Sequence, residues 1–413
     1  MPASDLQTSV VDDAKVVVGT VVMKFGAASV GDPEQIRAVA ARLVAARDRG
    51  LRVVGVISAM GTTTDQLLDL ARQVSPGPDP RELDMLLSVG ERISCALVAM
   101  AVGDLGREAI SLTGSQAGII TDAGHGNARI VEVRARRIHQ ALDEDRVVLV
   151  AGFQGMSETK DITTLGSDGT DTSAVALAAS LGAGTCELYA DIDLSTADPH
   201  IVPNACRHAA LSYEEALELA AAGAGALQLR SLEFARSHAV RLRVLSTVGD
   251  EPGTWIMEQN ESMEKAAVTS VAHSLEEAVY RVQGPDPSEL FTTLADAQVN
   301  VDTIVQAGTD VIVFSAPLED RVKAARALDG LGATWSERDD LAKIALVGGG
   351  MKNQPGVAAR TFETLRNLRI EPHFISTSPI RISFYVLQDD VERAVRSLHD
   401  AFELDSAVEV ADA

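Results

Sequence analysis

Residues 15–26 read KVVVGTVVMKFG, and this stretch decides the fold class. It is almost continuously apolar and rich in β-branched residues up to position 23, which predicts a central strand covered on both faces. A helix is expected next, because Asp32 can cap its first turn and Gly50 can end it. At the end of such a strand, before the helix, the ammonium of Lys24 and the amide of Gly26 can bind an anion, as in many phosphate sites. The same turn also occurs in α/β proteins that bind no phosphate, so both interpretations stay open.

Outward from this stretch, strand-like and helical segments alternate over about 230 residues, which predicts a mostly parallel sheet with helices on both faces. The expected strands are 51–57, 146–150, 187–192 and 240–245, and the expected helices are 33–50, 171–181 and 214–222. Asp171 is expected to cap the helix that it begins. Residues 153–168 interrupt the alternation with a polar stretch rich in glycine and threonine, and a site is expected there.

The second part of the chain has shorter elements, and they follow a linker-like stretch that contains glycine, proline and several acids. Their order predicts two small βαββαβ units in tandem. The expected organisation is a disordered leader at 1–14, an α/β domain at 15–250, a linker at 251–265, and two units at 266–339 and 340–413.

The composition argues against several classes of function. The chain has 413 residues and a formal net charge of −23, which argues against nucleic acid and anionic membranes because both need basic patches. No apolar run approaches the ~20 residues of a membrane span. Cys95, Cys186 and Cys206 have neither disulfide nor metal-ligand spacing. These features predict a soluble cytoplasmic protein that acts on small molecules, with no metal site and no nucleic-acid or membrane partner.

A series of strings along the chain resembles one known family. In order they are VVMKFGAASV, SAMGTTTDQLLDLA, DMLLSVGERIS, LTGSQAGIIT, GNARI, VAGFQG, DITTLGSDGTDTSAVALAA, TADPHIVPNA, SMEKAAVTSVAH, KIALVGGGMKNQPGVAARTFETL and ISTSPIRIS. Together they resemble aspartate kinase, particularly the actinobacterial form, from Val16 onward. The resemblance implies an amino-acid-kinase fold over 15–250, followed by two ferredoxin-like ACT domains. It also implies that these ACT domains bind an effector amino acid and form the contacts of a homodimer.

The resemblance also implies which residues form the site. Lys24 and Gly26 match the family's opening lysine and glycine, and Glu91 matches the acid that holds the substrate ammonium. The candidate catalytic residues are Lys24, Glu91 and Asp171, which match the family, and Asp168 and His200, which stand at positions where the chain departs from it. The candidate substrate contacts are Gly26, Ser58, Thr164 and Ser167.

The chain departs from the family pattern on the phosphate side. Ala27 and Ala28 stand where the family has a second glycine and a hydroxyl, and a Cβ at position 27 obstructs close approach to a phosphoryl group. His200 replaces an arginine. The nucleotide loop is shorter, and the remnant of the nucleotide pocket consists of Asp191, Asp193 and Gly225, of which Gly225 replaces a lysine.

The aspartate side departs as well. Ser167 stands where the family has the arginine that anchors a substrate carboxylate, and Asp168 adds an acid beside it. A pair of unit charges ~4 Å apart is worth up to ~4 kcal/mol at an effective dielectric near 20. The combined loss of cations therefore weighs against efficient phosphoryl transfer.

Three hypotheses follow. The first is an enzyme that descends from aspartate kinase but performs acid–base chemistry on an amine- or imine-containing metabolite in a specialised biosynthetic pathway, using Glu91, Asp168, Lys24 or His200 and no cofactor. The alternative is a functional aspartate kinase that forms 4-phospho-L-aspartate from Mg-ATP and L-aspartate. The third is a non-catalytic regulatory subunit retained for its ACT domains. The sequence analysis favours the first.

Overall fold

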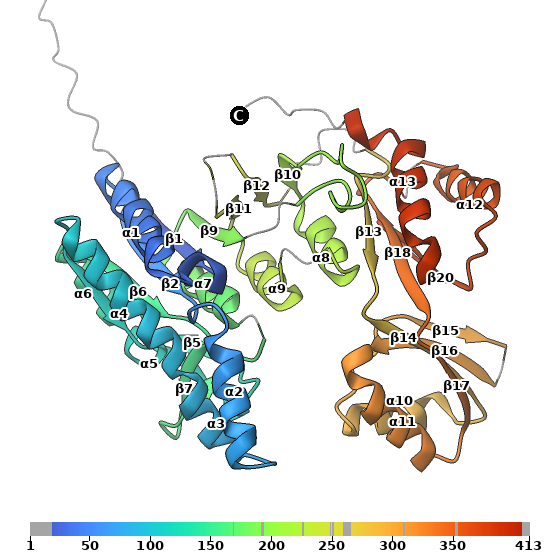
Figure 1. Ribbon diagram of the computed structural model, residues 1–413, viewed down its shortest axis with the longest axis horizontal. Coiled ribbons are helices and arrows are strands. Elements are labelled where there is room, and N and C mark those ends of the chain that lie inside the picture. Colours follow the sequence, from blue (N-terminus) through green and yellow to red (C-terminus); the bar gives the residue numbers. More distant parts are fainter. Residues whose placement is uncertain are drawn as a thin grey trace, which may run out of the picture.

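The computed structural model describes residues 19–167, 169–190, 194–224, 227–247, 249, 252–258, 266–308, 310–351 and 354–406. Within these residues, the N-terminal part is built on a large sheet of strand order β10-β12-β11-β9-β1-β2-β6-β3 (Figure 1). Neighbouring strands run parallel apart from the pair β11–β12. The bounds are β1 (Thr20–Phe25), β2 (Arg52–Ile57), β3 (Ala109–Leu112), β6 (Val147–Ala151), β9 (Thr185–Ala190), β10 (Ala210–Leu211), β11 (Leu242–Ser246) and β12 (Thr254–Ile256). The predicted mostly parallel sheet is confirmed.

The central strand is apolar throughout because helices cover both faces of the sheet. Val22 belongs to the core of one face, while Val21 and Met23 belong to the core of the other. Asp32 caps the helix after β1 as predicted, since its carboxylate accepts two amides of the first turn at 2.8 and 2.9 Å. The helices on one face are α1 (Pro33–Asp48) and α4 (Val89–Asp104), and those on the other are α6 (Arg136–Asp143), α7 (Gly169–Leu181), α8 (Tyr213–Ala221) and α9 (Leu229–Ser237).

The polar stretch at 153–168 contributes a hairpin to a second, small sheet. The strand order of this sheet is β5-β4-β7-β8. Its strands are β4 (Ile119–Thr121), β5 (Ile130–Val133), β7 (Gln154–Ser157) and β8 (Ile162–Thr164), and short helices beside it are α2 (Thr63–Val74), α3 (Pro80–Leu87) and α5 (Gly114–Ala117). The loops of this sheet lie next to the carboxyl end of the large sheet, where the candidate site is found.

The C-terminal part consists of two ferredoxin-like units, but they do not simply follow one another. One sheet has the order β15-β16-β14-β17 and the other the order β13-β18-β20-β19. The strand β13, which precedes the first unit in the chain, pairs with β18 of the second. The bounds are β13 (Ser270–Ser274), β14 (Glu277–Gln283), α10 (Pro287–Asp296), β15 (Ile304–Ala307), β16 (Val311–Pro317), α11 (Arg321–Gly330), β17 (Thr334–Arg338), β18 (Leu341–Val347), α12 (Val357–Leu368), β19 (Phe374–Ser378), β20 (Arg381–Leu387) and α13 (Val391–Ala401). In the sequence, the first unit therefore lies between β13 and β18, which are neighbouring strands in the sheet of the second unit.

Helix α8 joins the N-terminal part to the second ferredoxin-like unit, and Figure 1 shows it beside β13. Glu215 accepts the amide of Gly349 at 3.1 Å. Glu218 accepts the hydroxyl of Ser378 at 3.0 Å and pairs with Arg381 at 2.9 Å. These carboxylates are three residues apart and therefore share one face of the helix.

Lys343 in β18 connects all three parts of the chain. Its side chain is 1% exposed, and its ammonium pairs with Glu277 of the first unit and with Asp302 at 2.9 Å. The same ammonium donates to the backbone carbonyl of Ala221, at the end of α8, at 2.8 Å. Tyr385 adds a hydrogen bond to Glu277 at 2.6 Å. A buried ammonium is tolerated here because Glu277, Asp302 and the carbonyl of Ala221 all accept hydrogen bonds from it.

One helical stretch, Pro80–Asp104, is long and apolar enough to cross a membrane by length and composition, with a mean hydropathy of 1.7. It consists of α3 and α4. Buried core helices pass the same test, and 44% of its most apolar window is buried inside the protein, so a single such helix is weak evidence for a membrane span.

Candidate active site

Lys24 and Asp171 form an ion pair at the carboxyl end of β1. Lys24 lies near the end of the strand, and Asp171 lies in the first turn of α7, where the helix dipole favours an acid. The distance from Nζ to Oδ1 is 2.7 Å, and both side chains are largely buried. A Cβ on Gly26 would lie 3.6 Å from this ammonium, so the glycine adjoins it without crowding. The expected capping role of Asp171 is wrong, because α7 begins at Gly169.

Ser58 and Thr170 form a second contact at this edge of the sheet. Ser58 follows β2, and its hydroxyl lies 3.0 Å from the hydroxyl of Thr170, the neighbour of Asp171. The helix α7 can come this close because position 152, just after β6, is a glycine: a Cβ there would lie 2.6 Å from Thr170 Cγ2. The carboxyl ends of β1, β2 and β6 therefore meet the N-terminus of α7, which is where open α/β sheets bind ligands.

Glu91 is a buried carboxyl group in the first turn of α4. The residue is 3% exposed, and burial raises its pKa to about 7 against the opposing effect of the amides of Glu91 and Ala59 and of the charge on Arg92. Its Oε2 atom has no hydrogen-bond partner. Because Ala59 follows Ser58 in the chain, this carboxyl group lies at the same edge of the sheet as the two contacts above. An unpaired buried carboxyl oxygen there suits a cationic group of a ligand.

Ser29 has a second buried oxygen without a partner. It lies in a short 3₁₀ turn (Ala27–Val30) directly after Gly26, and its hydroxyl has no hydrogen-bond partner among the described residues. Native proteins leave few buried polar atoms unsatisfied, so this hydroxyl is a candidate for contact with a ligand or a water molecule.

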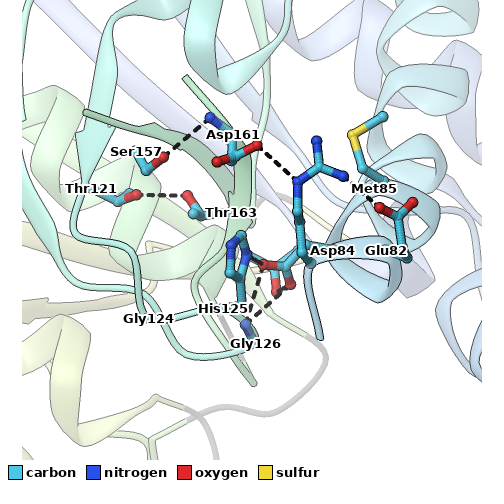
Figure 2. A network of polar contacts seen from close by, with 12 residues as sticks. Glu82, Asp84, Met85, Thr121, Gly124, His125, Gly126, Ser157, Asp161 and Thr163 are labelled. Carbon is cyan, nitrogen blue, oxygen red and sulfur yellow. Dashed lines mark hydrogen bonds and ion pairs between the residues drawn. The ribbon is translucent and has the colours of Figure 1, made fainter. Parts of the chain in front are cut away.

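Asp84 organises the loops beside this site (Figure 2). Its carboxylate is 1% exposed and accepts the hydroxyl of Thr164 at 2.5 Å and the amide of Gly126 at 3.1 Å. The ring of His125 contacts it at 2.7 Å. The hydroxyl of Thr164 is therefore bonded within the protein, and its predicted contact with substrate stays a prediction.

The other predicted residues are placed as follows. Ser167 is exposed at the end of the loop after β8, two residues before α7 begins. His200 is exposed, its amide donates to Asp198 at 2.9 Å, and its loop packs through Ile201 against the second ferredoxin-like unit. His200 has no described contact with Lys24 or Asp171. Asp168, Asp191, Asp193 and Gly225 lie outside the described residues.

Sequence reasoning missed Asp84, Ser29 and Thr170. An acid on the buried side of an apolar helical run, as in DMLLSVGERIS, is a usable signal for Asp84. Ser29 and Thr170 have no comparable signal, because a serine or threonine next to a glycine-rich turn is common.

Comparison with known proteins identifies the family. The model of the amino acid kinase family matches residues 19–246, and an ACT domain model matches residues 344–402. The aspartokinase of Corynebacterium efficiens is 49% identical over 93% of this chain and 96% of its own length, and that of Corynebacterium glutamicum is 48% identical over the same shares. The chain belongs to the aspartokinase family. A crystal structure of E. coli aspartokinase III in complex with aspartate and ADP has a TM-score of 0.80 and covers 92% of this chain and 99% of its own, and at 22% identity it confirms the fold.

The aspartokinase relatives correct the favoured functional hypothesis. An enzyme for a different metabolite, without phosphoryl transfer, is contradicted by relatives that are nearly half identical over 93% of the chain and carry the name aspartokinase. That hypothesis rested on the combined loss of several cations, inferred from mismatched positions. The obstruction expected from the Cβ of Ala27 stays a prediction.

Proposed function

We propose that this aspartokinase-family chain transfers the γ-phosphoryl group of ATP to the β-carboxylate of L-aspartate and so forms 4-phospho-L-aspartate. The observation that carries the proposal is the buried carboxyl group of Glu91, whose Oε2 atom has no hydrogen-bond partner, at the same edge of the sheet as the ion pair of Lys24 and Asp171. The family membership and the names of the relatives support it.

The side chains have complementary roles in this reaction. The carboxylate of Glu91 binds the ammonium of aspartate, because it is buried and its Oε2 atom lacks a partner. Lys24 offsets the negative charge that gathers when a carboxylate meets a triphosphate, and Asp171 orients it. A β-carboxylate oxygen forms the new bond to the γ-phosphorus as the bond to the bridging oxygen of ADP breaks. The nucleophile is already ionised, so the step needs no general base.

Mg²⁺ is expected to enter with ATP. Among the described residues, no group of three or more His, Cys, Asp or Glu side chains is arranged to hold a metal. This fits a magnesium ion bound mainly by phosphate oxygens and one or two carboxylates, among which Asp171 is a candidate. When bound, the ion neutralises phosphate charge.

The proposal is tested by ADP release that depends on L-aspartate, with hydroxylamine trapping of the acyl phosphate as an aspartyl hydroxamate. Lys24→Met is expected to lower kcat by about 10²–10³-fold, because a positive charge at the transferred group is lost. Lys160→Met, at the exposed turn after β7, is the matched control and should retain activity. Wild-type protein that releases no ADP with aspartate would contradict the proposal.

The setting of the reaction is proposed with it. A cytoplasmic location, small-molecule effectors at the ACT domains and a homodimer formed through those domains follow from the family. Light scattering after gel filtration should give about twice the 43.6 kDa of one chain, and a monomer mass would contradict the dimer.

A further inference from the structure

Two loops meet beside the candidate active site and are called the rim here: residues 122–129, between β4 and β5, and residues 165–167, between β8 and α7. The amide of Ala128 donates to the carbonyl of Thr164 at 2.9 Å. Gly166 has φ of +82°, and a Cβ on it would lie 2.9 Å from the side-chain oxygen of Asn127. The two loops are thus in close contact, and the second leads directly into the turn that carries Asp171.

Arg230, in the first turn of α9, binds both loops of the rim. Its Nη1 donates to the carbonyl of Leu165 at 2.6 Å and to the side-chain oxygen of Asn127 at 3.3 Å, and its Nη2 donates to the carbonyl of Ala128 at 2.6 Å. Asp84 binds the same region from the side of α3, through Gly126 and Thr164. The rim is therefore held by one acidic side chain, from α3, and by one basic side chain, from α9.

The charge on Arg230 is not neutralised by an ion pair among the described residues. Its acceptors are two backbone carbonyls and an amide oxygen, which are dipoles without net charge. Burial, and then the nearby charge of Arg129, lower the pKa of Arg230, yet a guanidinium stays protonated in proteins. Asp122 is the neighbouring acid, and its pKa is lowered first by the amide of Arg129 and further by the charges of both arginines. The guanidinium of Arg230 therefore binds the rim without an ion-pair partner among the described residues, next to the loop that ends at Ser167.

We propose that Arg230 is a positioning residue for L-aspartate: its contacts with Leu165, Asn127 and Ala128 fix the rim, and the rim leads into the turn that carries Asp171. The inference rests on the proposed function. It does not require Arg230 to touch the substrate, because its hydrogen bonds are made to the loops. Loss of the guanidinium should therefore loosen the rim and weaken binding of L-aspartate far more than it slows phosphoryl transfer.

The test measures steady-state kinetics of full-length Arg230→Gln, Arg230→Lys and Arg236→Gln. Arg236 is an exposed arginine on the same helix and is the matched control. We expect Arg230→Gln to raise KM for L-aspartate about tenfold or more, with kcat and KM for ATP changed less than about threefold. Arg230→Lys should restore part of the affinity, because an ammonium can still reach one carbonyl.

Hydrogen exchange provides a readout independent of turnover. Peptides that cover 122–129 and 165–167 should exchange faster in Arg230→Gln and unchanged in Arg236→Gln. An unchanged KM for aspartate, or equal losses in kcat and in both KM values, would overturn the role of Arg230 and leave the kinase function standing. A wild-type protein without aspartate-dependent ADP release would instead overturn the function and this inference together.

Discussion

Glu91 is the residue whose environment makes the most direct prediction about pH. Its carboxyl group titrates at about pH 7 because it is buried, and only the ionised form attracts the ammonium of aspartate. KM for L-aspartate should therefore fall by about tenfold as the pH rises from about 6 to about 8, with the midpoint near the pKa. Glu91→Gln should raise KM and remove this pH dependence. A wild-type KM that is flat over this range would contradict the assignment.

The ionisation of Glu91 also affects stability: a rising pH favours binding of aspartate but should destabilise the folded protein. Burial raises the pKa of Glu91 from 4.5 to about 7, so between these two pH values the folded protein keeps a proton that the unfolded chain releases. Its contribution to stability is complete below about pH 4.5 and is lost as the pH rises through 7. Glu91→Gln cannot ionise, and its melting temperature relative to the wild type should increase from about pH 5.5 to about pH 8. A difference that does not change with pH would show that the carboxyl group is solvated.

At the scale of single elements, α8 is predicted to be the main polar link between the N-terminal part and the second ferredoxin-like unit. Glu218→Gln weakens its bonds to Ser378 and Arg381, which are partly buried, and should cost about 1–3 kcal/mol in the free energy of unfolding by urea. Glu214→Gln, on the exposed side of the same helix, should change it by less than about 0.5 kcal/mol. Equal losses in the two variants would argue against a specific link.

The elements also show what the sequence could and could not predict. The N-terminal strands and helices that were expected from the sequence lie within a few residues of observed ones, because apolar periodicity and the cap at Asp32 are local signals, whereas elements such as β3, α6 and α9 were not predicted. Lys24 and Asp171 were both predicted, and the ends of β1 and α7 bring them together. The pairing of β13 with β18 was not predicted, since partner choice between strands depends on contacts distant in sequence. Arg230 was missed because its acceptors are mainly backbone carbonyls, which every residue has.

At the scale of the whole molecule, Lys343 is predicted to make unfolding cooperative. Lys343→Met leaves Glu277 and Asp302 without their cation and should cost about 3–5 kcal/mol. Trp255 in β12 and Trp335 in β17 report on different parts of the chain, so single-tryptophan variants can follow each part by fluorescence. The two transitions should coincide with Lys343 present and separate in Lys343→Met.

The control for this experiment is a cation whose ion pair is exposed. Arg366 pairs with Glu363 on α12, and both side chains are well exposed. Arg366→Met should leave the two transitions coincident and change stability by less than about 0.5 kcal/mol. Coincident transitions in Lys343→Met would mean that packing alone couples the three parts.

Because β13 belongs to the sheet of the second unit, the first unit is an insertion between two neighbouring strands of that sheet and can be removed as a whole. Ser274, at the end of β13, is the pairing partner of Lys343 in β18, so the chain leaves and re-enters the neighbouring sheet at adjacent points. Strands that are antiparallel neighbours can be joined by a turn of a few residues. Replacing residues 275–340 by such a turn would keep that sheet intact and would remove Glu277 and Asp302 together with their unit. The entire first unit can thus be gained, lost or exchanged through a single insertion point in this architecture.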